Sequence, residues 1–224
     1  MIERGMIFNG EMVRAILDGR KTQTRRPVRF PVLDKNLGCE LAGNELAGEL
    51  SAGNYLNSAF GKPGHRIWVR ESFQGPLVSE EFFEEYRAHP EKFETPQYCE
   101  YSADGGAKPE YCDLDDNLRH GWRPSIHMPR WASRILLEIT NVGVQRLQSI
   151  SPNDAAREGL VKLPATGRYC INQGDQYFGG ASHDAREVFS WLWASIYGEE
   201  SWNANPWVWV IEFKRIEGGD HATN

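Results

Sequence analysis

The chain has 224 residues and a net charge of −6, and it is 40% hydrophobic and 12% aromatic. This composition is that of a folded globular protein, long enough for one large domain or two small ones. The negative charge argues against bulk attraction to nucleic acid, although it is compatible with a small local basic site.

The cysteines and histidines form no metal-binding pattern. The four cysteines are widely spaced without a CxxC pair, and the six histidines show no HxH or HExxH spacing. No apolar run reaches the length of a membrane span, and no signal peptide is recognised. We therefore expect a cytoplasmic protein with reduced thiols and without a metal, a cofactor or a membrane partner.

The N-terminal segment predicts a strand, a helix and then an unusual polar stretch. Residues 6–8 suit a short strand, Asn9 can cap the helix that follows, and Gly19 can end it. Residues 20–27 then hold four cations and two hydroxyls before a proline. Such a stretch contributes little to a core and suits the handling of an anion or an acyl group.

The middle of the chain alternates between predicted elements and excursions. Residues 31–60 are irregular with a short helix near 41–50, and 67–73 predict a strand. Glu71 falls on the inward side of that strand, so it requires an arginine or lysine partner. Between 74 and 121 we expect a helical patch near 80–88, a strand at 98–103 and an acidic loop at 107–121.

Residues 122–132 form a second unusual stretch, with two prolines, two arginines, a histidine and a tryptophan at each end. It fits a binding loop and a surface crossover equally well. Residues 14–29 and 119–134 are two basic segments in an acidic chain, which could form one cradle if the fold joins them.

The C-terminal third predicts a strand or hairpin at 134–148 and a short helix capped by Ser151 that reaches Glu158. A glycine-rich loop at 162–182, an amphipathic helix at 183–197 and a strand at 207–216 follow. Strands interrupted by single helices favour a compact α+β barrel over a doubly wound sheet. The stretch after Gly218 should be a flexible tail.

The motif Gly-Arg-Lys-Thr-x-Thr-x-Arg at 19–26 resembles the signature of the ASCH superfamily, small β-barrels related to PUA RNA-binding domains. The chain also resembles the longer ASCH-like proteins that are often encoded by phages and prophages. The resemblance implies a single PUA-like domain over 1–217, with insertions at about 31–60, 74–121 and 162–182 and a tail at 218–224.

Some small ASCH proteins remove the acetyl group from N4-acetylcytidine. The resemblance implies Lys21, Thr24 and Glu158 as catalytic residues of such an amidohydrolase. Thr24 would attack the acyl carbon, or Lys21 and Glu158 would activate a water that Thr24 orients. Lys21 needs a lowered pKa to act as a base. Because Lys21 and Thr24 would point to opposite faces of a regular strand, they converge only if the chain turns between them.

Two other functions compete with the amidohydrolase. A binding module could hold a modified base or RNA, with Trp68, Trp122 and Trp131 for stacking and Arg123 and Arg130 for phosphates. A metal-independent ribonuclease would use His127 with Lys21. A small nucleoside is the expected partner, single-stranded nucleic acid is the alternative, and the oligomeric state stays open. The candidate substrate-binding residues are Arg20, Arg25, Arg26, Trp68, Arg70, Glu71, His127, Arg130 and Trp131.

Overall fold

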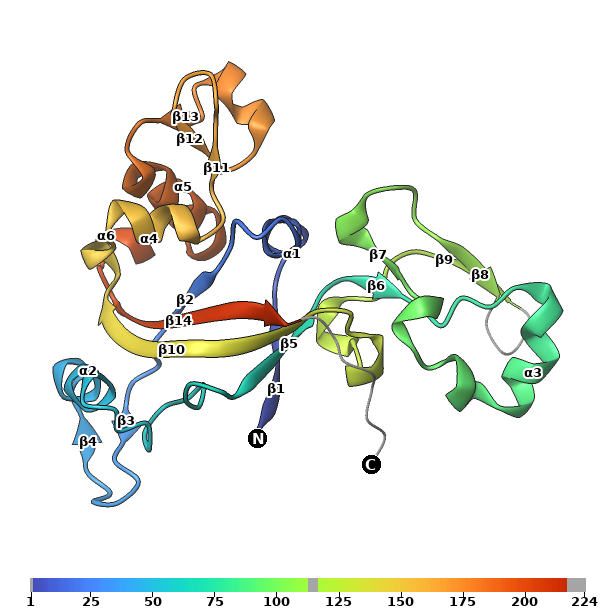
Figure 1. The fold of residues 1–224 in the computed structure, drawn as a ribbon, viewed down its shortest axis with the longest axis horizontal. Coiled ribbons are helices and arrows are strands. Elements are labelled where there is room, and N and C mark those ends of the chain that lie inside the picture. Colours follow the sequence, from blue (N-terminus) through green and yellow to red (C-terminus); the bar gives the residue numbers. More distant parts are fainter. Residues whose placement is uncertain (1, 113–116, 217–224) are drawn as a thin grey trace. The chain divides into compact units, whose positions relative to one another are not determined.

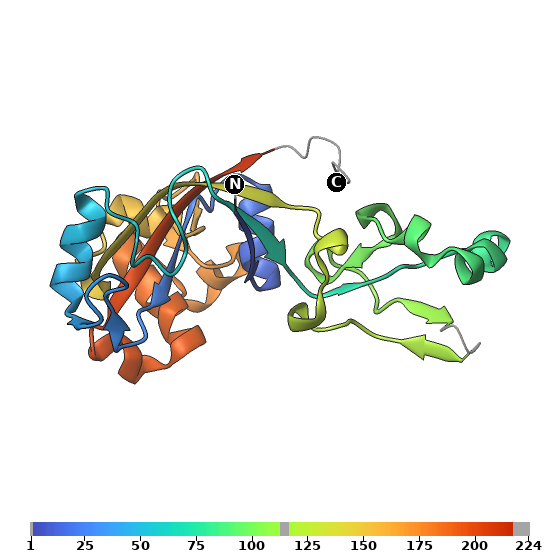
Figure 2. The same ribbon diagram turned by 90° about the horizontal axis from the view of Figure 1, so that it is seen from below.

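The computed structural model describes residues 2–112 and 117–216, and these form two compact units of α+β structure (Figures 1 and 2). The first unit contains residues 2, 15–65 and 138–214. The second contains 3–14, the described part of 66–137, and 215–216. The predicted excursion at 74–121 belongs to the second unit, and those at 31–60 and 162–182 belong to the first. The expected tail at 218–224 lies outside the described residues.

Three strands in the order β10-β14-β2 organise the first unit. They are β2 (Gln23–Pro27), β10 (Leu136–Arg146) and β14 (Trp207–Ile216). Strand β14 runs antiparallel to β2, with Ile211 opposite Thr24 and Glu212 opposite Gln23. The prediction of a strand at 207–216 is confirmed, and the stretch at 134–148 is one long strand rather than a hairpin.

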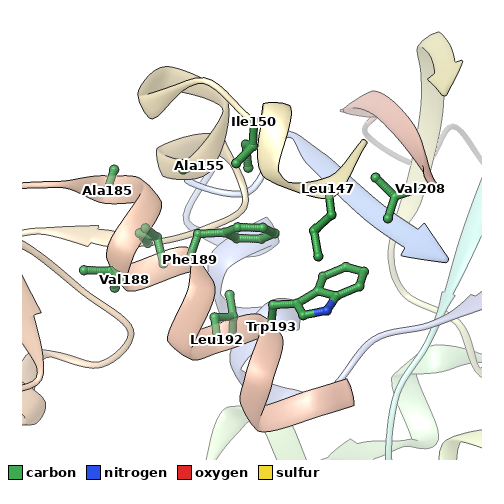
Figure 3. Packing of buried hydrophobic residues seen from close by; sticks show 10 residues of the cluster. Leu147, Ile150, Ala155, Ala185, Val188, Phe189, Leu192, Trp193 and Val208 are labelled. Atoms are coloured by element: carbon green, nitrogen blue, oxygen red, sulfur yellow. The ribbon is translucent and has the colours of Figure 1, made fainter. Parts of the chain in front are cut away.

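Three helices cover one face of these strands. They are α4 (Pro152–Arg157), α5 (Ala185–Tyr197) and α6 (Glu199–Asn203). Figure 3 shows Phe189 and Trp193 of α5 directed toward Leu147 and Val208. Each of these side chains is buried, so the amphipathic face of α5 forms the core of this layer. The expected helix at 183–197 is therefore confirmed.

The remaining elements of the first unit are short. The helix α2 (Gly43–Ser51) confirms the one predicted near 41–50, and it follows the hairpin of β3 (Val32–Leu33) and β4 (Glu40–Leu41). The glycine-rich loop predicted at 162–182 contains short regular elements that the sequence did not indicate. That stretch contains an antiparallel sheet of β11 (Val161–Lys162), β12 (Tyr169–Cys170) and β13 (Ala181–Ser182), whose two-residue strands give too little alternation to detect.

The second unit contains a parallel pair, β1 (Glu3–Ile7) and β5 (Arg66–Arg70). Two antiparallel pairs accompany it: β6 (Phe73–Gln74) with β7 (Glu100–Tyr101), and β8 (Glu110–Cys112) with β9 (Leu118–His120). The helix α3 (Phe83–Ala88) confirms the helical patch. The expected acidic loop contains the antiparallel pair β8–β9 in its described part, and the expected strand at 98–103 is only two residues long before a 3₁₀ turn.

The helix α1 (Gly10–Leu17) begins and ends at the predicted residues. The Met12 amide donates to Asn9 Oδ1 at 2.8 Å, and Gly19 adopts a φ of +75° after the last turn. No described helix is long and apolar enough to cross a membrane.

Gly43 at the start of α2 provides a test of packing in the first unit. A Cβ at this position would lie 2.3 Å from the ring of Trp207, whereas one at Gly48 in the same helix would meet nothing within 4 Å. We expect Gly43→Ala to lower the free energy of unfolding by about 1–3 kcal/mol through overpacking. Gly48→Ala, the matched control, should raise it by up to about 1 kcal/mol through helix propensity. Urea denaturation of both variants measures this, and equal effects would contradict the contact.

Candidate functional site

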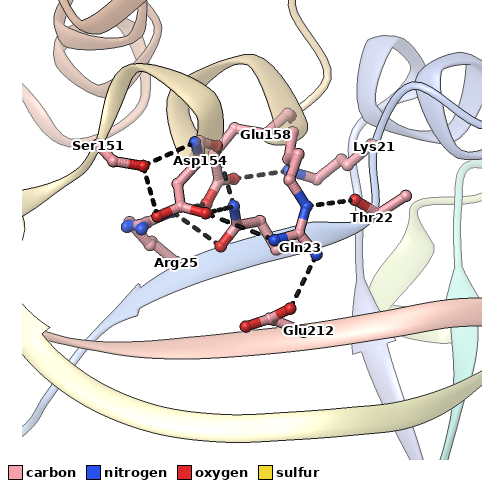
Figure 4. Close-up of polar contacts among 9 residues, drawn as sticks. Lys21, Thr22, Gln23, Arg25, Ser151, Asp154, Glu158 and Glu212 are labelled. Atoms are coloured by element: carbon pink, nitrogen blue, oxygen red, sulfur yellow. Dashed lines mark hydrogen bonds and ion pairs between the residues drawn. The ribbon is translucent and has the colours of Figure 1, made fainter.

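Glu158 lies at the centre of a buried ionic cluster with Lys21 and Arg25 (Figure 4). Lys21 Nζ is 2.8 Å from Glu158 Oε2 and 2.8 Å from the Glu158 carbonyl oxygen. Arg25 Nη1 donates to Glu158 Oε1 at 2.8 Å. The side chains of Lys21, Arg25 and Glu158 are only 0%, 1% and 4% exposed. One carboxylate therefore accepts from two cations in a site that water barely reaches.

Local signals around α4 bring Glu158 to this position. Ser151 caps the helix by accepting from the Asp154 amide at 3.1 Å, and Pro152 occupies the first turn. Glu158 follows the last helical residue, and Gly159 then turns the chain with a φ of +109°. A Cβ at Gly159 would lie 3.1 Å from Lys21 Cβ, so a glycine lets the chain pass close to the lysine.

The backbone of Lys21 is held on both sides. Its amide donates to the Ala15 carbonyl at 2.9 Å, and the next amide, that of Thr22, donates to the Arg157 carbonyl at 3.0 Å. An antiparallel bridge pairs Lys21 with Glu158. The main chain thus fixes the lysine and the glutamate relative to each other before their side chains interact.

Gln23 and Asp154 extend the cluster toward the surface. Gln23 Nε2 donates to the carbonyl and to Oδ1 of Asp154, both at 3.0 Å, and Gln23 Oε1 accepts from Arg25 at 3.3 Å. Ser151 Oγ donates to Asp154 Oδ2 at 2.8 Å. Our sequence reasoning missed Gln23, although its period-two spacing with Lys21 and Arg25 could have placed all three on one face.

Hydrogen bonds of Arg157 connect this part of the chain to β14. Arg157 Nε donates to Thr22 Oγ1 at 3.1 Å, and Arg157 Nη2 lies 2.8 Å from Glu212 Oε2. Arg157, Asp154 and Glu212 are also not identified as site residues by the sequence. Asp154 contacts Ser151 and Arg157 within its own helix, but the contacts with Thr22, Gln23 and Glu212 join residues far apart in the chain.

Burial lowers the pKa of Lys21 below its usual value of 10.5. Glu158 opposes this shift by its charge and its hydrogen bond, whereas the nearby charges of Arg26 and Arg25 add to it. The expected direction of the pKa shift is thus present, with desolvation as its main cause. Arg25 Nε has no hydrogen-bond partner among the described residues, and the guanidinium lies 5.9 Å from the centre of the Phe189 ring.

Thr24 does not share this face. Residues opposite each other in an antiparallel pair project to the same side of a sheet. Gln23 and Arg25 lie opposite Glu212 and Val210, whereas Thr24 lies opposite the fully buried Ile211. The chain is extended here, so the turn that would bring Thr24 toward Lys21 is not present. Lys21 therefore contacts Glu158, whereas the Thr24 side chain lies on the opposite face of β2.

The other basic residues of the motif have partners of their own. Arg20 forms an ion pair with Asp18 at 3.0 Å and donates to the Gly159 carbonyl, which supports the turn after Glu158. Arg26 is half-buried and lies opposite Trp209. Among the described residues, Arg20 forms no hydrogen bond or ion pair with the Glu158 side chain.

The second unit contains the remaining candidates. Glu71 has the predicted cationic partner, because Arg134 donates to both of its carboxylate oxygens at 3.0 Å. Burial raises the pKa of Glu71, and Arg134 partly offsets this. Arg70 lies 5.4 Å from the Trp68 ring centre and donates to the Ser125 and Ile126 carbonyls.

The stretch at 122–132 has its polar groups largely engaged within the second unit. Arg130 donates to Glu3 at 3.1 Å, and Arg123 donates to the Gly75 carbonyl while lying over Phe73. Trp131 packs on the core of Phe73, Tyr101, Met128 and Ala132, whereas His127 is exposed. These contacts favour the crossover interpretation over the binding loop.

The described residues contain no group of three or more histidine, cysteine, aspartate or glutamate side chains arranged to hold a metal ion. No protein-family model, curated protein or solved structure matches the chain.

Removing the Glu158 charge should destabilise the protein strongly. Glu158→Gln leaves Lys21 and Arg25 without their shared anion, and we expect a loss of about 3–5 kcal/mol in the free energy of unfolding. The control Glu212→Gln removes a carboxylate from the partly exposed pair with Arg157, and it should cost at most about 1 kcal/mol. Urea denaturation at pH 7 compares them. Similar losses would show that the cluster is not central to stability.

The lowered pKa of Lys21 predicts a pH dependence of stability. Between this pKa and the ordinary value of 10.5, the unfolded chain binds more protons than the folded one. The free energy of unfolding should therefore rise with pH over this window, relative to that of Lys21→Met. Chemical denaturation of both proteins between pH 7 and about 10.5 measures the difference. Parallel curves would contradict the shift.

Proposed function

We propose that this protein is an amidohydrolase that acts on an N-acylated pyrimidine nucleoside such as N4-acetylcytidine, and that its chain forms an ASCH-like domain with a PUA-related barrel. The motif at 19–26 supports the family. The observation that carries the activity is the contact of the buried Lys21 amine with Glu158.

The hydrogen bonds of Lys21 can also be made by a neutral amine. A neutral amine has two N–H donors, and Lys21 Nζ has two acceptors at 2.8 Å, both on Glu158. The third donor of an ammonium group finds no further acceptor among the described residues. Because burial lowers the pKa of Lys21, the amine loses its proton more readily than an exposed lysine, and the neutral form has a lone pair that can accept a proton.

The proposed reaction requires the buried Lys21 to become accessible to water and substrate. Its neutral form then takes a proton from a water as the water oxygen attacks the acyl carbon. The ammonium then returns this proton to the departing exocyclic nitrogen, and the C–N bond breaks to give the free acid and the nucleoside. Glu158 orients the amine and stabilises its charged form, and Arg25 keeps the carboxylate in place. The resemblance implied two mechanisms, a Thr24 nucleophile or a water activated by Lys21 and Glu158. The proposed reaction is the second.

Thr24 has a structural role in this proposal. Its side chain is buried beside Ile211 on the other face of the strand. A threonine on this side of β2 contributes to packing rather than to attack on the acyl carbon.

Binding without catalysis is less well supported. Arg123 and Arg130, the expected phosphate contacts, already donate to groups of the same chain. The Trp68 ring is covered by the Arg70 guanidinium, which competes with a stacked base.

The test is hydrolysis of N4-acetylcytidine, followed by chromatographic separation of cytidine. We expect turnover by the wild type and a loss of about 10²–10⁴-fold in Lys21→Met, since general acid–base catalysis contributes this much. Thr24→Val keeps the shape of the side chain and should retain activity within about tenfold. Activity should increase with pH through the lowered pKa of Lys21.

Lys214→Met is the matched control, because this lysine forms a partly exposed pair with Glu138. It should leave turnover unchanged. Circular dichroism of each variant verifies that the fold is retained. Absence of turnover by folded wild type, or full activity in folded Lys21→Met, would refute the proposal.

A further inference from the structure

Arg25 makes an incomplete contact with Glu158, and the proposed reaction does not account for this feature. An arginine beside a carboxylate frequently donates to both of its oxygens through its planar fork. In the described part of the chain, Arg25 contacts this carboxylate through Nη1 alone, which donates to Oε1 at 2.8 Å. The buried Nε has no partner there, although an unpaired buried donor costs free energy.

Gln23 holds the arginine in this arrangement. A terminal nitrogen of a guanidinium group carries two N–H donors. Arg25 Nη1 donates to Glu158 Oε1 and, at 3.3 Å, to Gln23 Oε1, so both of its donors have an acceptor. A rotation of the guanidinium toward both carboxylate oxygens would break the contact with Gln23.

Asp154 fixes the orientation of the Gln23 amide. Gln23 Nε2 donates to the carbonyl and to Oδ1 of Asp154, both at 3.0 Å. A flipped amide would place its oxygen against these two acceptors. Burial would raise the pKa of Asp154, but its hydrogen bonds to Ser151 and Gln23 help to keep that pKa below its usual value. The ionised form of Asp154 is therefore favoured, and it keeps Gln23 Oε1 directed at Arg25.

We propose that Gln23 is a positioning residue that limits Arg25 to one oxygen of the Glu158 carboxylate. The other oxygen, Oε2, then accepts from Lys21 Nζ at 2.8 Å. The catalytic meaning of this role rests on the proposed function, in which Glu158 orients the Lys21 amine. The contacts themselves do not depend on it.

The support that Lys21 receives from Glu158 depends on this division of the carboxylate. The charges that act on the Lys21 amine are those of Glu158, Arg26 and Arg25. Without Gln23, Arg25 would be free to donate to both Glu158 oxygens and to draw the carboxylate away from the amine. The ammonium form of Lys21 would then lose support, and the pKa of this lysine should fall further.

An NMR titration of the lysine side chains in the full chain tests this role, and Lys21→Met identifies the Lys21 signal. We expect Gln23→Met to move the Lys21 midpoint to lower pH by at least about half a pH unit. Gln23→Glu keeps an acceptor for Arg25 Nη1, so its midpoint should lie at or above that of the wild type. The matched control Gln148→Met removes a hydrogen bond to the Trp202 carbonyl and should not move the midpoint.

A double-mutant cycle separates positioning from a general loss of packing. Arg25→Lys keeps the charge but lacks the fork that can engage both carboxylate oxygens. In this background Gln23→Met should therefore not lower the Lys21 midpoint. An equal shift in both backgrounds, an unchanged or higher midpoint in Gln23→Met, or the same shift in Gln148→Met would each overturn the proposal.

Circular dichroism of each variant verifies that the fold is retained. If Gln23→Met does not fold, Gln23→Glu decides. A midpoint at or above that of the wild type then supports the proposal, and a lower midpoint overturns it.

The titration does not require turnover, so the positioning role and the proposed function can fail separately. A lower midpoint in Gln23→Met, without hydrolysis of N4-acetylcytidine by the wild type, would support the role of Gln23 and refute only the reaction. With hydrolysis, the rising limb of the pH–kcat profile of Gln23→Met should move to lower pH together with the NMR midpoint. A profile that stays in place while the midpoint moves would refute the role of Gln23 in catalysis.

Discussion

The burial of Lys21, Arg25 and Glu158 is the constraint on which the first unit depends. A charge taken out of water without a partner costs several kcal/mol, so these side chains are tolerated only when they meet. Glu158 satisfies both cations, with contacts of 2.8 Å to each. The end of α4 must therefore lie against the stretch that leads into β2, and the arrangement of the helical layer follows from this contact.

Successive side chains of β2 project to opposite faces of the strand, so the ionic cluster and Thr24 lie on different faces. Lys21, Gln23 and Arg25 face α4, whereas Thr24 faces the side of Ile211. One face thus carries the buried polar cluster, and the other places Thr24 opposite the buried Ile211. In the proposed amidohydrolase, this separation would favour an activated water over a threonine nucleophile, since the amine and the hydroxyl lie on different faces of the strand.

The elements that could be predicted are those with local signals. Asn9, Gly19 and Ser151 end or begin helices through hydrogen bonds and backbone angles within a few residues, and their predicted roles are confirmed. The strand β14 has ten residues of strong β-propensity. The two-residue strands at 161–182 and the hairpin at 110–120 could not be predicted, because pairing across the chain creates them rather than their own sequence.

The sequence by itself determined that residues 19–26 carry a basic, hydroxyl-bearing motif, and that a buried Glu71 would require a cationic partner. It could not determine which residues share a site. Only the tertiary structure brought Glu158 to Lys21, added Gln23 and Asp154 to the cluster, and separated Thr24 from it. The physical reason is that strand register and helix placement are set by contacts between distant residues, and a shift of one residue in register moves every side chain to the other face.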